Sequence, residues 1–164
     1  MFDQEQWEQL LVSFLEEAKE LIQNAETALL ALDEQAADED TINGLFRAMH
    51  TLKGSAGLFS LDSFVRFAHQ MENLIMRVRD GELALGEEMV GALLQALDVL
   101  RSEIFSLEAS GTPSAIDEMH ADLLSLLQKL AGNQVPVEAT EAPVNVTAAR
   151  ASRSTSQLAY LSAL

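Results

Sequence analysis

Apolar residues recur at alternating intervals of four and three over residues 7–32. The positions are Trp7, Leu11, Phe14, Ala18, Leu21, Ala25, Ala28 and Leu32. This spacing places these side chains along one side of an α-helix. The pattern therefore predicts one long amphipathic helix, followed by an acidic break at residues 33–40.

Three further helices are predicted, each with its own apolar stripe. The second follows the acidic break and is expected to weaken near Gly54 and Gly57. The third stops at residues 80–81, and the fourth covers about residues 87–107. The potential N-cap residues of the third helix are Ser60, Asp62 and Ser63. The predicted core residues are Ile42, Leu45, Phe46, Met49, Leu52 and Ala56 in the second helix, Leu61, Phe64, Ala68, Met71, Leu74, Ile75 and Val78 in the third, and Val90, Leu93, Leu94, Leu97, Leu100, Ile104 and Leu107 in the fourth.

A fifth helix is predicted after Gly111, because Thr112 can cap a helix and Pro113 suits its first turn. It ends at Gly132. Long helices joined by short connections pack as antiparallel neighbours. We therefore expect an all-α domain over residues 1–132, an antiparallel four-helix bundle with a fifth, accessory C-terminal helix. Residues 133–164 have no hydrophobic period and are expected to be a flexible linker or tail, largely disordered.

Composition supports this fold class and excludes some chemistry. Hydrophobic residues make up 48% of the chain but aromatic residues only 5%, which predicts an aliphatic, helical core. The chain has no cysteine, so disulfides and thiolate catalysis are excluded. It also lacks a secretory-signal pattern and any uninterrupted apolar run of membrane-spanning length. We expect no membrane insertion and a cytoplasmic location.

The charge is large but unevenly distributed. The net charge is −16, which makes nucleic acid an unsuitable partner. Residues 45–79 differ, because they hold five cations against two acids, a local charge of +3. The cations of this basic segment are Arg47, Lys53, Arg66, Arg77 and Arg79. Their side chains either lie on solvated helix faces or hold phosphate and dock an acidic partner.

The segment centred on His50 is the strongest candidate for chemistry. On a helix, Arg47, Lys53 and Gly54 lie one turn from His50, so the imidazole has cations beside it and open space next to it. If the second and third helices form an antiparallel hairpin, Glu72 lies at about the same depth as His50. A carboxylate could then meet the imidazole.

Two motifs on these helices resemble a known family. The residues His50-Thr-Leu-Lys-Gly-Ser-Ala-Gly57, followed by His69-Gln-Met-Glu-Asn-Leu, are similar to the histidine-containing phosphotransfer (HPt) family, and especially to the amino-terminal phosphotransfer domains of chemotaxis histidine kinases. The resemblance extends over roughly residues 1–131. Family members often have a further glycine after the first motif, where this chain has Ser60.

The resemblance implies a role for each motif residue. His50 would be phosphorylated on Nε2, and Glu72 would accept the Nδ1 hydrogen and fix the tautomer. Lys53 would offset the phosphoryl charge, and His69 would support Glu72 or the phosphoryl group through a hydrogen bond. The remaining candidates, Arg47, Gly54 and Gly57, would let a partner dock against the helix.

The resemblance also implies the partners. The chain has no nucleotide-binding loop, so we expect it not to phosphorylate itself. A separate histidine kinase ATP-binding domain, in cis or in trans, would supply the γ-phosphoryl group of ATP. The receiver domain of a response regulator would accept it on an aspartate. ATP and Mg²⁺ would be held by those domains, and this domain would bind no cofactor or metal. The chain is then a phosphoryl carrier and a fragment of a two-component sensor kinase.

Two other functions stay open at this point. His50, His69 and Glu72 could form a metal site, although the paired Glu-x-x-His motifs of di-iron bundles are missing. Alternatively, the bundle could be an adaptor or scaffold that is never phosphorylated. His120, on the fifth predicted helix, has no comparable neighbours and is expected to be structural.

Overall fold

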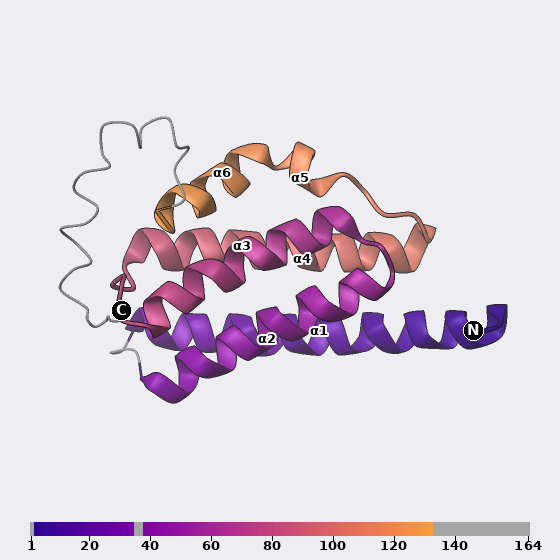
Figure 1. Ribbon diagram of the computed structural model, residues 1–164, viewed down its shortest axis with the longest axis horizontal. Coiled ribbons are helices and arrows are strands. Elements are labelled where there is room, and N and C mark those ends of the chain that lie inside the picture. The colour runs from indigo at the N-terminus through magenta and orange to yellow at the C-terminus, as the bar shows by residue number, and fades with distance from the viewer. Residues whose placement is uncertain (1, 35–37, 133–164) are drawn as a thin grey trace. The chain divides into compact units, whose positions relative to one another are not determined.

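The computed structural model describes residues 2–34 and 38–132, and these residues form six α-helices (Figure 1). The helices are α1 (Gln4–Glu34), α2 (Glu39–Leu58), α3 (Asp62–Arg79), α4 (Glu87–Ser110), α5 (Ile116–Met119) and α6 (Ala121–Leu130). No strand occurs within the described residues. The predicted all-α class is therefore confirmed. The predicted linker, residues 133–164, lies outside the described residues.

The first four helices form an antiparallel bundle, as predicted (Figure 1). Contacts join α1 to α2 and α4, and join α3 to α2 and α4, so the four helices enclose one mainly aliphatic core. The α2–α3 pair has the most extensive contact. Asp38 caps the first turn of α2, since its carboxylate accepts the Thr41 N–H at 2.8 Å. None of the described helices is long and apolar enough to cross a bilayer.

The turn between α2 and α3 differs from the sequence prediction. Helix α2 continues through both glycines to Leu58, and Leu61 occupies the N-cap position of α3 without a side-chain cap bond. Ser60 has a φ of +56°, which is the left-handed conformation that favours glycine. The family's frequent glycine in this region therefore has a physical reason, and Ser60 adopts the conformation in its place.

The prediction of a single fifth helix is wrong in detail, because the structure has two short helices there, α5 and α6. The backbone leaves the helical conformation at His120, which has φ −124° and ψ 42° and separates α5 from α6. Thr112 is not a cap, since α5 begins at Ile116. Asp117 accepts a 2.7 Å hydrogen bond from the Ser63 hydroxyl of α3. At the other end, Arg77 of α3 donates to the carbonyl of Ala131. The break therefore lies between two separate attachments to α3.

Exposure at the amino-terminal end of α1 also departs from the predicted pattern. Trp7 was assigned to the apolar stripe but is 39% exposed. Figure 1 shows that the first turns of α1 extend beyond the α2–α3 turn, so little of the bundle covers them. The Trp7 ring packs on Phe59 of that turn, with centroids 4.9 Å apart. Full burial of the predicted stripe begins only at Phe14.

Candidate functional site

An imidazole and a buried carboxylate meet between α2 and α3. Nδ1 of His50 lies 2.5 Å from Oε2 of Glu72. The His50 side chain is 64% exposed, whereas that of Glu72 is 8% exposed. The antiparallel α2–α3 hairpin brings the two residues to the same depth although 22 positions separate them. The juxtaposition expected from the sequence is therefore present in the structure.

The second oxygen of Glu72 is also paired. The ammonium group of Lys53, one turn beyond His50 on α2, donates to Oε1 at 2.6 Å. Burial raises the pKa of Glu72, but the hydrogen bonds and positive charge of Lys53 and His50 outweigh this effect and leave the pKa below its ordinary value. Glu72 is therefore a carboxylate at neutral pH, with both oxygens used by α2.

This geometry sets the chemistry of the imidazole. An ionised Glu72 accepts only, so Nδ1 of a neutral His50 must carry the ring hydrogen. The lone pair is then on Nε2, the ring nitrogen that does not face Glu72. Because the His50 side chain is largely exposed, a partner can approach it. The arrangement leaves Nε2 as the ring nitrogen that can act as a nucleophile.

A stack of side chains beside His50 was missed in the sequence. The rings of Phe46 and His50 are nearly parallel, with an interplanar angle of 16° and centroids 6.0 Å apart. The guanidinium carbon of Arg79 lies 4.3 Å from the centroid of the Phe46 ring. The sequence pattern predicts a core position for Phe46, but the structure shows it half-buried. Its spacing of four residues from His50 was the available signal.

The surface of α2 around His50 is open. Beyond the adjacent backbone of its own helix, a Cβ atom added at Gly54 or Gly57 would meet no heavy atom within 4 Å. Arg47 is exposed and forms no ion pair with the residues that the structure describes. Leu58, at the end of the helix, is 71% exposed. The docking roles expected of Arg47, Gly54 and Gly57 fit this exposure and stay predictions.

The basic segment does not act as one surface. Arg66 pairs with Asp117, and Arg77 pairs with Glu82 and bonds the end of α6. These two arginines therefore hold α5 and α6 against α3. The sequence left open whether these cations are solvated or bind phosphate; in the structure, Arg66 and Arg77 have partners within the domain.

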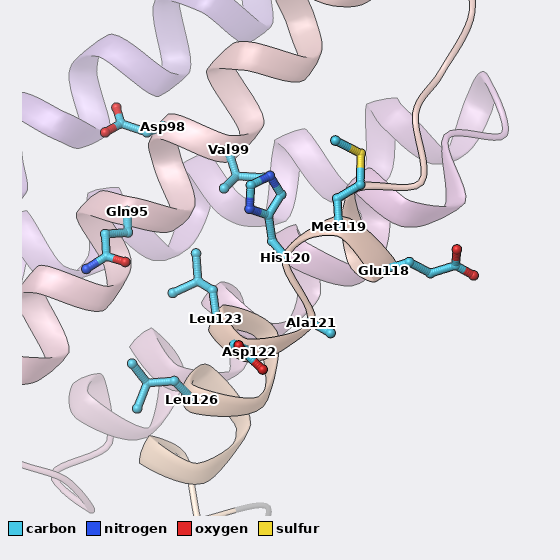
Figure 2. Close-up of a pocket in the computed structure, with 10 residues that line it drawn as sticks. All are labelled: Gln95, Asp98, Val99, Glu118, Met119, His120, Ala121, Asp122, Leu123 and Leu126. Carbon is cyan, nitrogen blue, oxygen red and sulfur yellow. The ribbon is translucent and has the colours of Figure 1, made fainter.

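The other two histidines lie apart from this pair. His69 is exposed on α3 and makes no hydrogen bond to Glu72 in the described part of the chain. Its other expected role, a hydrogen bond to the phosphoryl group, stays a prediction. Both Glu72 oxygens already have partners on α2. His120 lies in a shallow groove of about 660 Å³ between α4 and the α5–α6 segment, together with Val99 and Leu123 (Figure 2). Within the described ranges, no cluster of three ligating side chains could hold a metal.

The fold and the site define a class of protein: a helical bundle that presents one hydrogen-bonded histidine from a two-helix hairpin. Residues 9–103 match the family model described as the Hpt domain. This match covers more than half of the chain and includes both His50 and Glu72. The chain therefore belongs to the Hpt domain family.

The sequence relatives of this chain are chemotaxis proteins. The chain is 33% identical over 137 residues to the chemotaxis protein CheA of Rhizobium meliloti, and 32% identical over 131 residues to that of Klebsiella aerogenes. The alignments cover 83% and 80% of this chain, but 18% and 20% of the relatives. The chain thus spans about a fifth of the length of these curated relatives.

Solved structures agree with the sequence relatives. The phosphorylated P1 domain of CheA3 in complex with CheY6 from R. sphaeroides has a TM-score of 0.71 and 27% identity, with coverage of 76% of this chain and 97% of that chain. The solution structure of the histidine phosphotransfer domain of CheA has a TM-score of 0.66 and 28% identity, with coverage of 75% and 90%. The chain is an Hpt domain similar to those of CheA.

The pairing of Glu72 predicts a pH-dependent contribution to stability. Because its pKa is lowered by folding, the contribution is present above the ordinary value of 4.5 and is lost as the pH falls through the folded-state pKa. At pH 7, Glu72→Gln should reduce the free energy of unfolding by about 1–3 kcal/mol. Urea unfolding of both chains between pH 7 and pH 3 measures the difference, which should shrink on acidification.

The control for this experiment is the exposed ion pair of Lys19 and Glu108. These groups are 2.8 Å apart, but their side chains are 32% and 48% exposed. Glu108→Gln should change stability by less than about 1 kcal/mol at any pH. A Glu72→Gln deficit that stays constant down to pH 3 would contradict the account.

Proposed function

We propose that this chain is a phosphoryl carrier in which Nε2 of His50 accepts a phosphoryl group from a histidine kinase domain and passes it to a response regulator. The observation that carries the proposal is the 2.5 Å hydrogen bond between Nδ1 and buried Glu72, made by an imidazole that is 64% exposed. A histidine buried for stability would not combine these two properties. The family membership and the CheA relatives support the same function.

In the first step, the Nε2 lone pair attacks the γ-phosphorus of ATP. A bond forms between Nε2 and phosphorus, the bond to the β–γ bridging oxygen breaks, and ADP leaves. The Nδ1 hydrogen stays in its bond to Glu72, whose charge stabilises the ring as it becomes more positive. Lys53 has three ammonium hydrogens and uses one on Glu72, so the others can bond a phosphoryl oxygen.

In the second step, a carboxylate oxygen of a receiver aspartate attacks the same phosphorus. The nitrogen–phosphorus bond breaks and its electron pair returns to Nε2. The starting tautomer is restored without a proton transfer, because Glu72 has kept the hydrogen on Nδ1. The complex of the CheA3 P1 domain with CheY6 supports a receiver of the CheY kind as the acceptor.

The partners hold everything else that the reaction requires. ATP and Mg²⁺ belong to the kinase domain, and the acceptor aspartate with its Mg²⁺ belongs to the receiver. The kinase domain lies on the same polypeptide or on another one, and the reaction takes place in the cytoplasm. This domain contributes the nucleophile, the oriented ring and an open helix face.

The proposal predicts that phosphate from ATP is found on one histidine. After incubation with ATP, Mg²⁺ and a CheA-type kinase domain, mass spectrometry should find an acid-labile phosphate on the chain. His50→Gln should abolish it, because no other described histidine is paired with a carboxylate. His120→Gln is the control and should be labelled like the original chain. Unchanged labelling of His50→Gln would contradict the proposal and favour an adaptor that is never phosphorylated.

The open face predicts opposite effects of small and large side chains at Gly54. Gly54→Ala should increase the free energy of unfolding by about 0.5–1 kcal/mol, because alanine favours a helix and meets no neighbour. Gly54→Trp should slow transfer to a receiver by on the order of tenfold or more, since the indole keeps the partner from its working distance. Urea unfolding and single-turnover transfer measure the two effects.

Gly91 of α4 offers the matched control, since its added Cβ also has open space. Gly91→Trp should leave transfer unchanged. Equal transfer rates for Gly54→Trp and Gly91→Trp would show that partners do not approach over this face of α2.

A further inference from the structure

The orientation of the His50 ring requires more than its hydrogen bond. The bond to Glu72 fixes one ring atom, Nδ1, but the ring plane can still rotate about that contact. With 64% of the side chain exposed, core packing does not restrict this rotation. An in-line attack requires the Nε2 lone pair to point in one direction. A second contact must therefore define the ring plane.

Phe46 is placed to provide that contact. It precedes His50 by one turn of α2, and helical side chains point back toward the preceding turn. The two rings are stacked with an angle of 16° and centroids 6.0 Å apart. Stacking on Phe46 restricts the tilt of the His50 ring plane. The hydrogen bond to Glu72 restricts the position of the Nδ1 edge of the same ring.

Phe46 is itself held from two sides. Part of the ring packs against the buried core, so the ring is not free to move into solvent. The guanidinium of Arg79, at the end of α3, lies over the ring with its central carbon 4.3 Å from the centroid. Arg79 therefore links the position of Phe46 to α3, the helix that also carries Glu72.

We propose that Phe46 is a positioning residue for phosphoryl transfer, which holds the His50 ring plane so that Nε2 points outward, and that Arg79 acts through Phe46. The inference rests on the proposed function of His50 as phosphoacceptor. It gives a function to the aromatic ring of Phe46. A half-buried core position alone does not require an aromatic side chain. The set of residues that prepare the nucleophile then comes from both helices: Phe46 and Lys53 from α2, and Glu72 and Arg79 from α3.

A small phosphodonor tests the proposal without partner docking. In phosphoramidate, Nε2 attacks the phosphorus, the donor's own nitrogen–phosphorus bond breaks, and ammonia leaves after taking a proton from solvent. The full 164-residue chain is used. Phe46→Leu keeps an apolar side chain against the core but removes the ring, and it should reduce the labelling rate of His50 by roughly three- to tenfold. Phe46→Tyr keeps the ring and should restore most of the rate.

Phe105 offers a matched control elsewhere on the bundle. Its ring is 50% exposed and lies under a cation, with the Lys19 ammonium 5.1 Å from the centroid. Phe105→Leu also removes an exposed aromatic ring that lies under a cation. It should leave the labelling rate of His50 unchanged. An equal loss in Phe105→Leu and Phe46→Leu would overturn the proposal, because it would show a general effect on the bundle.

A spectroscopic measurement separates positioning from stability. In ¹⁵N NMR spectra, the two ring nitrogens of His50 should report a single tautomer with a slowly exchanging Nδ1–H. In Phe46→Leu the ring signals of His50 should shift and broaden as the ring plane becomes mobile, while the tautomer and the His120 signals stay unchanged. A Phe46→Leu chain with the original His50 signals and labelling rate would overturn the proposal. If the original chain shows the tautomer but the kinase cannot phosphorylate it, the proposed function fails instead.

Arg79 provides the last comparison. Because it acts through Phe46, Arg79→Met should reduce the phosphoramidate rate less than Phe46→Leu, by roughly twofold. In the Phe46→Leu background, Arg79→Met should have no further effect. A loss larger than that of Phe46→Leu, or a full additional loss in the double variant, would show that Arg79 contacts the phosphoryl group directly and would overturn this part of the proposal.

Discussion

A buried carboxylate with both oxygens paired is the constraint on which the site depends. Removing the charge of Glu72 from water costs several kcal/mol unless partners compensate for it, and both partners come from the neighbouring helix. His50 and Lys53 are one turn apart on α2, so they satisfy Glu72 only when α2 and α3 are in one register. The interaction that fixes the hairpin is therefore also the one that prepares the imidazole. Burial of the carboxylate and exposure of the histidine are two parts of one arrangement.

Helix α3 separates this site from the attachment of the accessory helices. Arg66 binds α5, and Arg77 binds the end of α6. Glu72 and Arg79 instead contact side chains of α2 near His50. Cations that are close together in the sequence therefore stabilise different contacts. His50 lies on the α2–α3 hairpin, where Glu72 and Phe46 contact its ring.

Much of the fold follows from local patterns. The intervals of three and four predict four of the helices, and the 22-residue separation predicts the meeting of His50 and Glu72 once a hairpin is assumed. The break at His120 was not predicted, because periodicity does not show the contacts of Asp117 and Ala131 with α3 that lie on either side of it. The stacking of His50 on Phe46 was not predicted either, because it also depends on tertiary packing. Periodicity assigns a residue to a face of a helix, but the edge of that face and its neighbours depend on how the helices pack.

The most direct test is to identify the nitrogen atom that carries the phosphoryl group. The chain is labelled with ¹⁵N-histidine, phosphorylated by a CheA-type kinase domain, and studied by ¹⁵N and ³¹P NMR. The account predicts a one-bond nitrogen–phosphorus coupling at Nε2 of His50 alone, with Nδ1 still protonated beside Glu72. Coupling at Nδ1 of His50, or at either nitrogen of His69 or His120, would contradict it.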